Sequence, residues 1–335
     1  MSYFTEKLKL ESKIKRIKII LAIIVSVLLL ALCIFSAFVP ARTWKYYVAK
    51  PKIEKRTDGE MRLHFLDVGQ GDAALIELPD GKIMLIDGGD GSEIATKSLM
   101  RYLNALKIKT IDYLLVTHAD SDHCGGLDVV LECKKVQNVY IPNLEEITNQ
   151  AYAQFAAALV KEKGCEVEFA SRSVILNGDG TYPYTLSFLY PYSLDVLEGD
   201  LGESNDVSAI VWMDYKGVST LFTGDATSEV ESVLMRDDTL GLFQQRGVDL
   251  ASTEILKVAH HGSKYSTSEK FLKYLHTQTA VISCGNGNIY GHPNAETLER
   301  LQNVNADVYR TDKNGNVMIT IHQDGTYTTK SIPNK

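Results

Sequence analysis

The chain has 335 residues, of which 45% are hydrophobic and 23% are charged, and its formal net charge is −7. This length supports one large hydrophobic core or two small ones, and the chain has no internal repeat that would indicate a solenoid. Residues 1–60 hold 12 Lys/Arg and 5 Asp/Glu, so residues 61–335 hold the other 23 and 37, a formal charge of −14. A region this acidic gains little from nonspecific attraction to nucleic-acid phosphates.

The first element along the chain is an apolar segment of 21 uncharged positions, from Ile19 to Val39. Because that length crosses about 30 Å of hydrocarbon as a helix, we expect a transmembrane helix over residues 19–39. Residues 1–18 are rich in lysine, so the positive-inside rule predicts a cytoplasmic N-terminus and an extracytoplasmic remainder. The alternative is a signal peptide cleaved near Ala41, with secretion of the rest, although its apolar region would be shorter, about 7–15 residues.

Residues 40–60 form a polar, basic stretch that we interpret as a stalk, followed by one soluble domain over residues 61–335. Asp80-Gly81 predicts a hairpin between strands over 61–77 and 82–87, and Lys216-Gly217 predicts a second hairpin. Further strands are expected around Gly178-Asp179-Gly180, Asn314-Gly315 and Asp324-Gly325. Helices are expected over 97–106, 148–163, 227–235, 269–275 and 294–301, with Gly164 ending the second and Asn294 capping the last. Strand-rich halves separated by helices fit an α/β fold, the four-layer αββα sandwich.

The densest cluster of chemically active side chains follows a predicted strand over residues 111–116. The run Thr117-His-Ala-Asp-Ser-Asp-His-Cys-Gly-Gly126 places two histidines and two aspartates within six positions. Imidazoles and carboxylates are the ligands that divalent cations such as Zn²⁺ and Mn²⁺ take in proteins. A buried strand therefore delivers four candidate metal ligands, His118, Asp120, Asp122 and His123, into one loop.

Two further apolar runs end in side chains of the same kind. Residues 221–226 end in Gly-Asp-Ala, with Asp225, and residues 255–263 end in His-His-Gly-Ser, with His260 and His261. Each predicted strand thus places a candidate ligand at its C-terminal end, where α/β folds usually build their sites.

These motifs resemble the metallo-β-lactamase superfamily, whose loop reads H-x-H-x-D-H; here Asp120 replaces the second histidine. The resulting H-x-D-x-D-H loop is similar to that of the C-terminal hydrolase domain of ComEC proteins, the competence DNA-uptake channels. The resemblance runs from about Arg62 to Ile321. Further matching segments are Phe65–Ala73, Leu85–Gly89, Glu203–Ser208, Tyr290–Pro293 and Tyr309–Asp312.

The resemblance implies a centre for one or two divalent ions. Asp122, His123, Asp225 and His260 would form one site, and His118, Asp120 and a bridging Asp225 would form another. The superfamily usually has one more histidine between the loop and the Gly-Asp segment, but no histidine lies between His123 and His260. Asn205 stands in the matching region, so an amide faces the metal there.

The second site is therefore poor in nitrogen ligands, and we expect Mn²⁺ or Zn²⁺ as the cofactor. Between His260 and His261 we favour His260 as the ligand, because it comes first after the strand, and we expect His261 to face the substrate.

The resemblance also implies roles for the surrounding side chains. Asp122 is a candidate proton acceptor, and His261 or His292 would protonate the leaving oxygen or hold a phosphate. We expect further contacts to the substrate from Asn205, Ser263 and Lys264, and support of the ligand loops by Asp67, Asp72 and Asp87.

The favoured hypothesis is a membrane-anchored, extracytoplasmic phosphodiesterase or nuclease that acts on DNA, with a DNA-uptake channel as a candidate partner. The acidic domain suits a small substrate better, so the alternative is a hydrolase of lactones, β-lactams or small phosphoesters. A third hypothesis is a non-catalytic module on the same fold.

Overall fold

The computed structural model describes residues 2–38, 41–144, 149–192 and 204–333, and divides the chain into a unit over Met1–Val48 and a unit over Ala49–Lys335. The first unit contains helix α1 (Ser2–Phe38) and the 3-10 helix η1 (Ala41–Tyr46). Residues Phe4–Ala37 have the length and composition of a membrane span, with a mean hydropathy of 3.2 over the most apolar window. The predicted basic N-terminus (residues 2–18) and the predicted transmembrane segment (residues 19–38) thus lie on one helix. Val39, Pro40 and Glu203 fall outside the described residues.

The second unit contains an eight-stranded sheet in the order β15-β14-β1-β2-β3-β4-β5-β6. The hairpin predicted at Asp80-Gly81 is confirmed, because β2 and β3 pair antiparallel across it. From β3 to β6 the strands are parallel, so their C-terminal ends share one edge of the sheet. The strands are β1 (Met61–Phe65), β2 (Ala74–Glu77), β3 (Ile83–Ile86), β4 (Thr110–Leu115), β5 (Lys135–Ile141), β6 (Glu166–Phe169), β14 (Asn316–Ile321) and β15 (Tyr327–Ile332).

A second sheet has seven strands in the order β13-β12-β11-β10-β9-β8-β7. The hairpin predicted at Lys216-Gly217 joins β9 and β10, and both turn residues have the positive φ that a tight two-residue turn requires. Strands β10 to β13 are parallel. The strands are β7 (Ile175–Asn177), β8 (Tyr184–Tyr190), β9 (Ile210–Tyr215), β10 (Val218–Phe222), β11 (Ile255–Lys257), β12 (Thr279–Ile282) and β13 (Asp307–Arg310).

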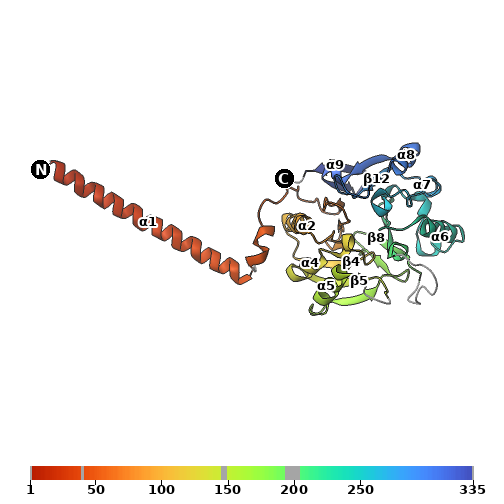
Figure 1. Cartoon of the computed structure of the whole chain (residues 1–335), viewed down its shortest axis with the longest axis horizontal. Helices are drawn as coiled ribbons and strands as arrows, with labels where there is room; N and C mark the ends of the chain where they lie inside the picture. Colours follow the sequence, from red (N-terminus) through yellow and green to blue (C-terminus); the bar gives the residue numbers. More distant parts are fainter. Residues whose placement is uncertain (1, 39–40, 145–148, 193–203, 334–335) are drawn as a thin grey trace. The chain divides into compact units, whose positions relative to one another are not determined.

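The two sheets pack face to face and helices cover their outer faces, which confirms the αββα sandwich. Phe65 of β1 stacks on Phe222 of β10 at 5.8 Å in the core between the sheets. His64, on the other face of β1, contacts Tyr102 of α2 (Glu93–Ala105). Helices α6 (Ser228–Thr239), α7 (Glu269–Leu275) and α8 (Ala295–Asn303) bury a second apolar core against the seven-stranded sheet. Figure 1 shows α2, α4 (Leu127–Cys133) and α5 (Gln150–Leu159) on one side and α6 to α8 on the other.

The five predicted helices are present, with local differences at their ends. Helix α5 stops at Leu159, before Gly164, because Val160 already takes the C-cap position. Asn294 occupies the N-cap position of α8, but its side chain accepts a hydrogen bond from Lys264 N instead of capping the helix. Strands β13 and β14 lie on either side of Asn314-Gly315, as predicted, and Asn314 ends the short helix α9 (Thr311–Asn314) between them.

Candidate metal centre

The candidate ligands come from the C-terminal ends of strands in both sheets. His118 follows β4, and Asp120 is the N-cap of the short helix α3 (Ser121–Cys124), which carries Asp122 and His123. Asp225 follows β10, and His260 and His261 lie on η5 (Ala259–Gly262) directly after β11. The three strand ends singled out by the sequence therefore meet at one place, between the two sheets.

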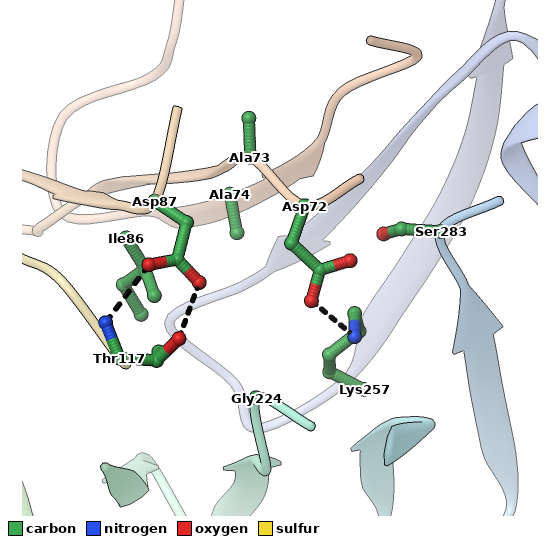
Figure 2. Close-up of a pocket in the computed structure, with 9 residues that line it drawn as sticks. All are labelled: Asp72, Ala73, Ala74, Ile86, Asp87, Thr117, Gly224, Lys257 and Ser283. Atoms are coloured by element: carbon green, nitrogen blue, oxygen red, sulfur yellow. Dashed lines mark hydrogen bonds and ion pairs between the residues drawn. The ribbon is translucent and has the colours of Figure 1, made fainter. Parts of the chain in front are cut away.

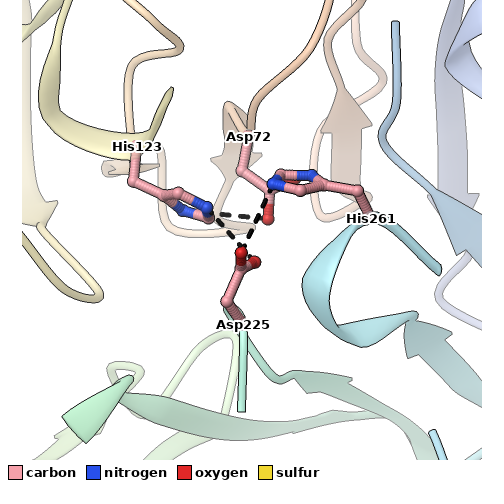
Figure 3. A group of neighbouring side chains, drawn as sticks. All are labelled: Asp72, His123, Asp225 and His261. Atoms are coloured by element: carbon pink, nitrogen blue, oxygen red, sulfur yellow. Dashed lines mark ion pairs between the residues drawn. The ribbon is translucent and has the colours of Figure 1, made fainter. Parts of the chain in front are cut away.

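Four side chains form a buried cluster there: Asp72, His123, Asp225 and His261 each offer a ligand atom within 4.8 Å of the others. His123 Nε2 lies 3.2 Å from Asp225 Oδ1, and His261 Nε2 lies 3.3 Å from Asp225 Oδ2. Figure 3 shows both rings and both carboxylates pointing toward a common centre. Asp122 adjoins the cluster, because its Oδ2 is 3.3 Å from His261 Nε2.

The side-chain atoms that face the middle of the cluster lie close together but form no hydrogen bonds to one another. Within the described residues, eight buried side-chain atoms around the centre have no hydrogen-bond partner, although buried polar atoms normally have one. A divalent cation would satisfy them, since imidazole nitrogens and carboxylate oxygens are its usual ligands. The atoms are Asp72 Oδ1, His118 Nε2, His123 Nε2, Asn205 Oδ1, Asp225 Oδ1, His260 Nδ1, His261 Nε2 and His292 Nδ1.

The other ring nitrogens of the two cluster histidines are held by the surrounding structure. His123 Nδ1 lies 2.8 Å from Asp87 Oδ2, and Asp87 in turn accepts hydrogen bonds from the backbone and hydroxyl of Thr117. His261 Nδ1 lies 3.0 Å from the carbonyl oxygen of Ser283, the residue after β12. Such partners fix the ring orientation of metal-binding histidines and turn Nε2 toward the metal. The residues present therefore fit a divalent ion.

The electrostatics of the cluster are governed by its histidine–carboxylate contacts. Burial alone would lower the pKa of His123 and His261, but the carboxylate of Asp225 and its neighbours outweigh burial and raise both values well above the usual range. Burial would likewise raise the pKa of Asp225, yet the two rings hold it well below its usual range. A bound cation would replace the protons of His123 and His261 as the positive charge that faces Asp225, so its binding would release protons.

Asp72 forms an ion pair with Lys257, the last residue of β11. Its Oδ2 is 2.5 Å from Lys257 Nζ, and both side chains are buried. The other oxygen, Oδ1, is 3.3 Å from His261 Nδ1. Figure 2 shows this pair beside Asp87 and Thr117 around a cavity of about 10 Å³, which is roughly the size that holds one water molecule.

A second group of candidate ligands adjoins the cluster. His118 Nε2 lies 3.6 Å from Asp120 Oδ2, and the rings of His118 and His123 are 4.1 Å apart. His260 Nε2 lies 3.8 Å from Asp225 Oδ2. Asn205 lies on η2 (Ser204–Val207), next to Asp225, because Ser208 connects the two through its backbone and its hydroxyl. The structure thus places His118 and Asp120 together beside His123, and it places His260 beside Asp225.

The backbone explains why His261 rather than His260 enters the buried cluster. Both residues have left-handed φ angles, 50° and 52°, which is rare for residues other than glycine. Gly262 follows with φ 85°, and a side chain at this position would collide with Pro293. The preference for His260 rested on its place as the first histidine after the strand, whereas the tight turn points His261 into the buried cluster. Which histidine binds a metal stays a prediction.

The remaining predicted residues lie around the rim or behind the centre. His292 is near both turn histidines, with ring distances of 5.5 Å to His260 and 6.3 Å to His261, and burial and those rings lower its pKa to about 4. Ser263 is buried and its hydroxyl accepts a hydrogen bond from Tyr265 N, whereas Lys264 is exposed. Asp67 accepts a hydrogen bond from Gly69 N in the loop before Asp72.

Sequence reasoning assigned no role at the centre to Lys257, Thr117 or Ser283, each of which contacts a member of the centre or its support. Lys257 left a signal, because it is the one charged residue in the otherwise apolar run from Ile255 to Ala259. The sequence contains no comparable signal for Thr117 and Ser283, since they act through a backbone group or a hydroxyl at a strand end.

Comparison with known proteins agrees with this fold. A family model of the metallo-β-lactamase superfamily matches residues 66–286. The chain is 32% identical over 278 residues to ComE operon protein 3 of Bacillus subtilis (strain 168), which covers 78% of this chain and 33% of that protein. It is 31% identical over 270 residues to Recombination protein 2 of Haemophilus influenzae, covering 77% of this chain and 29% of that protein.

The chain thus spans about a third of the length of these curated relatives. Among solved structures, a candidate metal-dependent hydrolase of Parabacteroides distasonis has 14% sequence identity and a TM-score of 0.40. The alignment covers 75% of this chain and 93% of that one. The expected resemblance to competence proteins of the ComEC type is confirmed by the curated matches.

Proposed function

Because the chain belongs to the metallo-β-lactamase superfamily, we propose that it is a metal-dependent phosphodiesterase that cleaves DNA outside the cytoplasmic membrane. One observation carries this proposal: His123 Nε2 and His261 Nε2 lie 3.2 and 3.3 Å from the two oxygens of the Asp225 carboxylate without forming hydrogen bonds to them. With Asp72 they form a buried cluster of two imidazoles and two carboxylates, which is suited to bind a divalent ion.

The ligand sets follow from the contacts around Asp225. Asp122, His123, Asp225 and His261 would hold one ion, with His260 as the alternative in the place of His261. His118, Asp120 and Asp225 would hold a second ion, and His260 lies close enough to supply the nitrogen that the superfamily takes from another histidine. Both sets are rich in carboxylates, so we propose Mn²⁺ as the preferred ion and Zn²⁺ as the alternative.

A bound divalent ion would act as a Lewis acid and lower the pKa of a coordinated water. The chain's own residues would position the substrate and move protons. Asp122 is suited to accept a proton, because its carboxylate adjoins the cluster yet its side chain is still 28% exposed. His292 and Lys264, at the rim, would contact the phosphate, and the buried Asn205 Oδ1 would face the second ion.

Support for DNA as the substrate comes from the relatives. The relatives with 32% and 31% identity are named for the ComE operon and for recombination, and recombination is a reaction of DNA. A DNA-uptake channel is accordingly the proposed partner. The formal charge of −14 over residues 61–335 favours small substrates instead, so lactones, β-lactams and small phosphoesters form the second candidate class.

We further propose that α1 anchors the chain in the membrane with the catalytic unit outside. The basic residues before the apolar segment support this orientation. Protease added to intact cells should then degrade the part after residue 49. Protection of that part until the cells are lysed would contradict the proposed orientation.

Metal-dependent cleavage tests the function directly. The full chain in detergent would be incubated with single-stranded DNA or bis-p-nitrophenyl phosphate, in Mn²⁺, Zn²⁺ or EDTA. We expect cleavage of both substrates with metal, and a loss of at least 100-fold in the Asp122→Asn variant, because it removes a proposed metal ligand and proton acceptor. Asp324→Asn, which changes an exposed aspartate in a hairpin turn, is the matched control and should retain activity.

The outcomes separate the candidate functions. Cleavage of the small ester alone would contradict DNA as the substrate and favour a small phosphodiester. Stable binding of metal without cleavage of either substrate would overturn the phosphodiesterase proposal and make lactones and β-lactams the next substrates to test.

A further inference from the structure

An exposed tyrosine marks the rim of the candidate metal centre. Tyr290 is 61% exposed and its neighbour Ile289 is 92% exposed, in the loop between β12 and α8. Large apolar side chains that stay exposed beside a site are frequent where a ligand covers them. The loop is ordered around this pair, because Asn288 contacts both the backbone nitrogen and the carbonyl oxygen of His292 at 3.0 and 2.6 Å.

A series of rings connects Tyr290 with the centre. The Tyr290 ring lies 5.8 Å from the His292 ring at an interplanar angle of 25°, which is a stacked arrangement. The His292 ring is in turn 5.5 Å from His260 and 6.3 Å from His261. One side of Tyr290 is therefore supported by His292, and much of the ring remains accessible to solvent. A planar group stacked on Tyr290 would be separated from the candidate ligands His260 and His261 by the rings of Tyr290 and His292.

Charge makes stacking the favoured mode of binding. With a formal −14 over residues 61–335, the domain as a whole gains little from nonspecific attraction to a phosphate backbone. Stacking of a base on an aromatic side chain does not depend on the charge of the protein, and it tolerates every base sequence. Only an unpaired base offers its face to such a ring, since paired bases are covered by their neighbours in the duplex.

We propose that Tyr290 stacks an unpaired base of the substrate strand next to the scissile phosphodiester, so that the enzyme acts preferentially on single-stranded DNA. This inference rests on the proposed phosphodiesterase function and adds its substrate class. Tyr290 acts as a binding residue, and it should affect KM for the strand rather than the rate of the chemical step.

Abasic DNA isolates the contribution of stacking, because it keeps the phosphodiester backbone and lacks the bases. The full chain in detergent with Mn²⁺ would be given two fluorescein-labelled strands of equal length, one of thymidines and one fully abasic. We expect KM for the abasic strand to be about tenfold higher, which corresponds to the loss of roughly one stacked base. A duplex of the same length should be cleaved more slowly than the single strand.

Variants assign this difference to one ring. Tyr290→Ala should raise KM for the thymidine strand about tenfold and leave KM for the abasic strand unchanged, while Tyr290→Phe should behave like the wild type. Tyr265→Ala is the matched control, because Tyr265 is 68% exposed and its ring packs against Lys264 Nζ at 5.2 Å. It should preserve the preference for the thymidine strand.

The results distinguish this inference from the proposed function. Equal loss on both strands in Tyr290→Ala, or equal KM of the wild type for both strands, would overturn the role of Tyr290. If the wild type cleaves neither strand, the proposed function fails. Fluorescence anisotropy of the same strands still tests stacking, since Tyr290→Ala must then weaken binding of the thymidine strand alone, and equal binding would contradict it.

Discussion

At the scale of single residues, the pair of Lys257 and Asp72 sets the charge behind the candidate metal centre. Asp72 has the position of a ligand, because its carboxylate lies within 4.8 Å of the ligand atoms of His123, Asp225 and His261. Its Oδ2 is nevertheless held by the buried Lys257 ammonium. Burial alone would raise the pKa of Asp72, but Lys257 and His261 outweigh burial and lower it. We infer that Lys257 keeps Asp72 as a support for His261 instead of a direct ligand.

Removing Lys257 should leave a buried carboxylate without its cation. We expect Lys257→Met to lower the free energy of unfolding by about 3–5 kcal/mol in EDTA, as measured by urea unfolding. The double variant Lys257→Met/Asp72→Asn should regain part of this loss, because it no longer buries an unpaired charge. If the single and double variants prove equally stable, the ion pair does not carry this energy.

At the scale of elements, two charged side chains hold the segment that leads from the histidine turn to α7. Glu231 of α6 is buried and accepts hydrogen bonds from the backbone nitrogens of Thr267 and Ser268. Arg300 of α8 donates to the carbonyl oxygens of Lys264 and Ser266. The segment is thus fixed from both sides by helices that pack on the seven-stranded sheet, which keeps the end of η5 in place.

Glu231 should make stability depend on pH, because burial raises its pKa to about 7, whereas an unfolded glutamate titrates near 4.3. Between pH 4.3 and 7 the folded state therefore binds more protons than the unfolded state. The resulting contribution of Glu231 to the free energy of unfolding is present below about pH 4.3 and is lost as the pH rises through 7. In urea unfolding with EDTA, Glu231→Gln should gain up to about 3 kcal/mol relative to the wild type between pH 4.5 and 8. Glu229→Gln, on the exposed first turn of α6, should show no such gain, and a constant difference for Glu231→Gln would contradict the raised pKa.

The histidine turn also shows where prediction from sequence stops. Strand ends, hairpins and helices were predictable because they rest on hydrophobic pattern and turn residues, which are local. Which of His260 and His261 enters the buried cluster depends on the left-handed backbone of both residues, and the histidine side chain does not predict that conformation. Lys257, Glu231 and Ser283 act through contacts between elements far apart in the chain, so only the folded structure reveals their partners.

At the scale of the whole molecule, the candidate centre joins the two sheets. The larger sheet and its loops supply Asp72, His118, Asp122 and His123, and the smaller sheet supplies Asp225, His260 and His261. The αββα architecture was predictable from the order of motifs, since each motif sits at the end of a strand. A site made by both halves of a sandwich links metal binding to the stability of the entire domain.

Metal should therefore stabilise the catalytic unit as a whole. An ion that binds only the folded state at 100 times its Kd adds about 2.7 kcal/mol to the free energy of unfolding. For a domain of this size we expect Tm to rise by about 5–10 °C when Mn²⁺ or Zn²⁺ replaces EDTA, as measured by calorimetry. Asp225→Asn, which weakens the carboxylate shared by both candidate sites, should abolish most of the shift, whereas Asp324→Asn should retain it. An equal Tm in EDTA and in saturating metal would show that the two halves of the sandwich are not joined through an ion at this place.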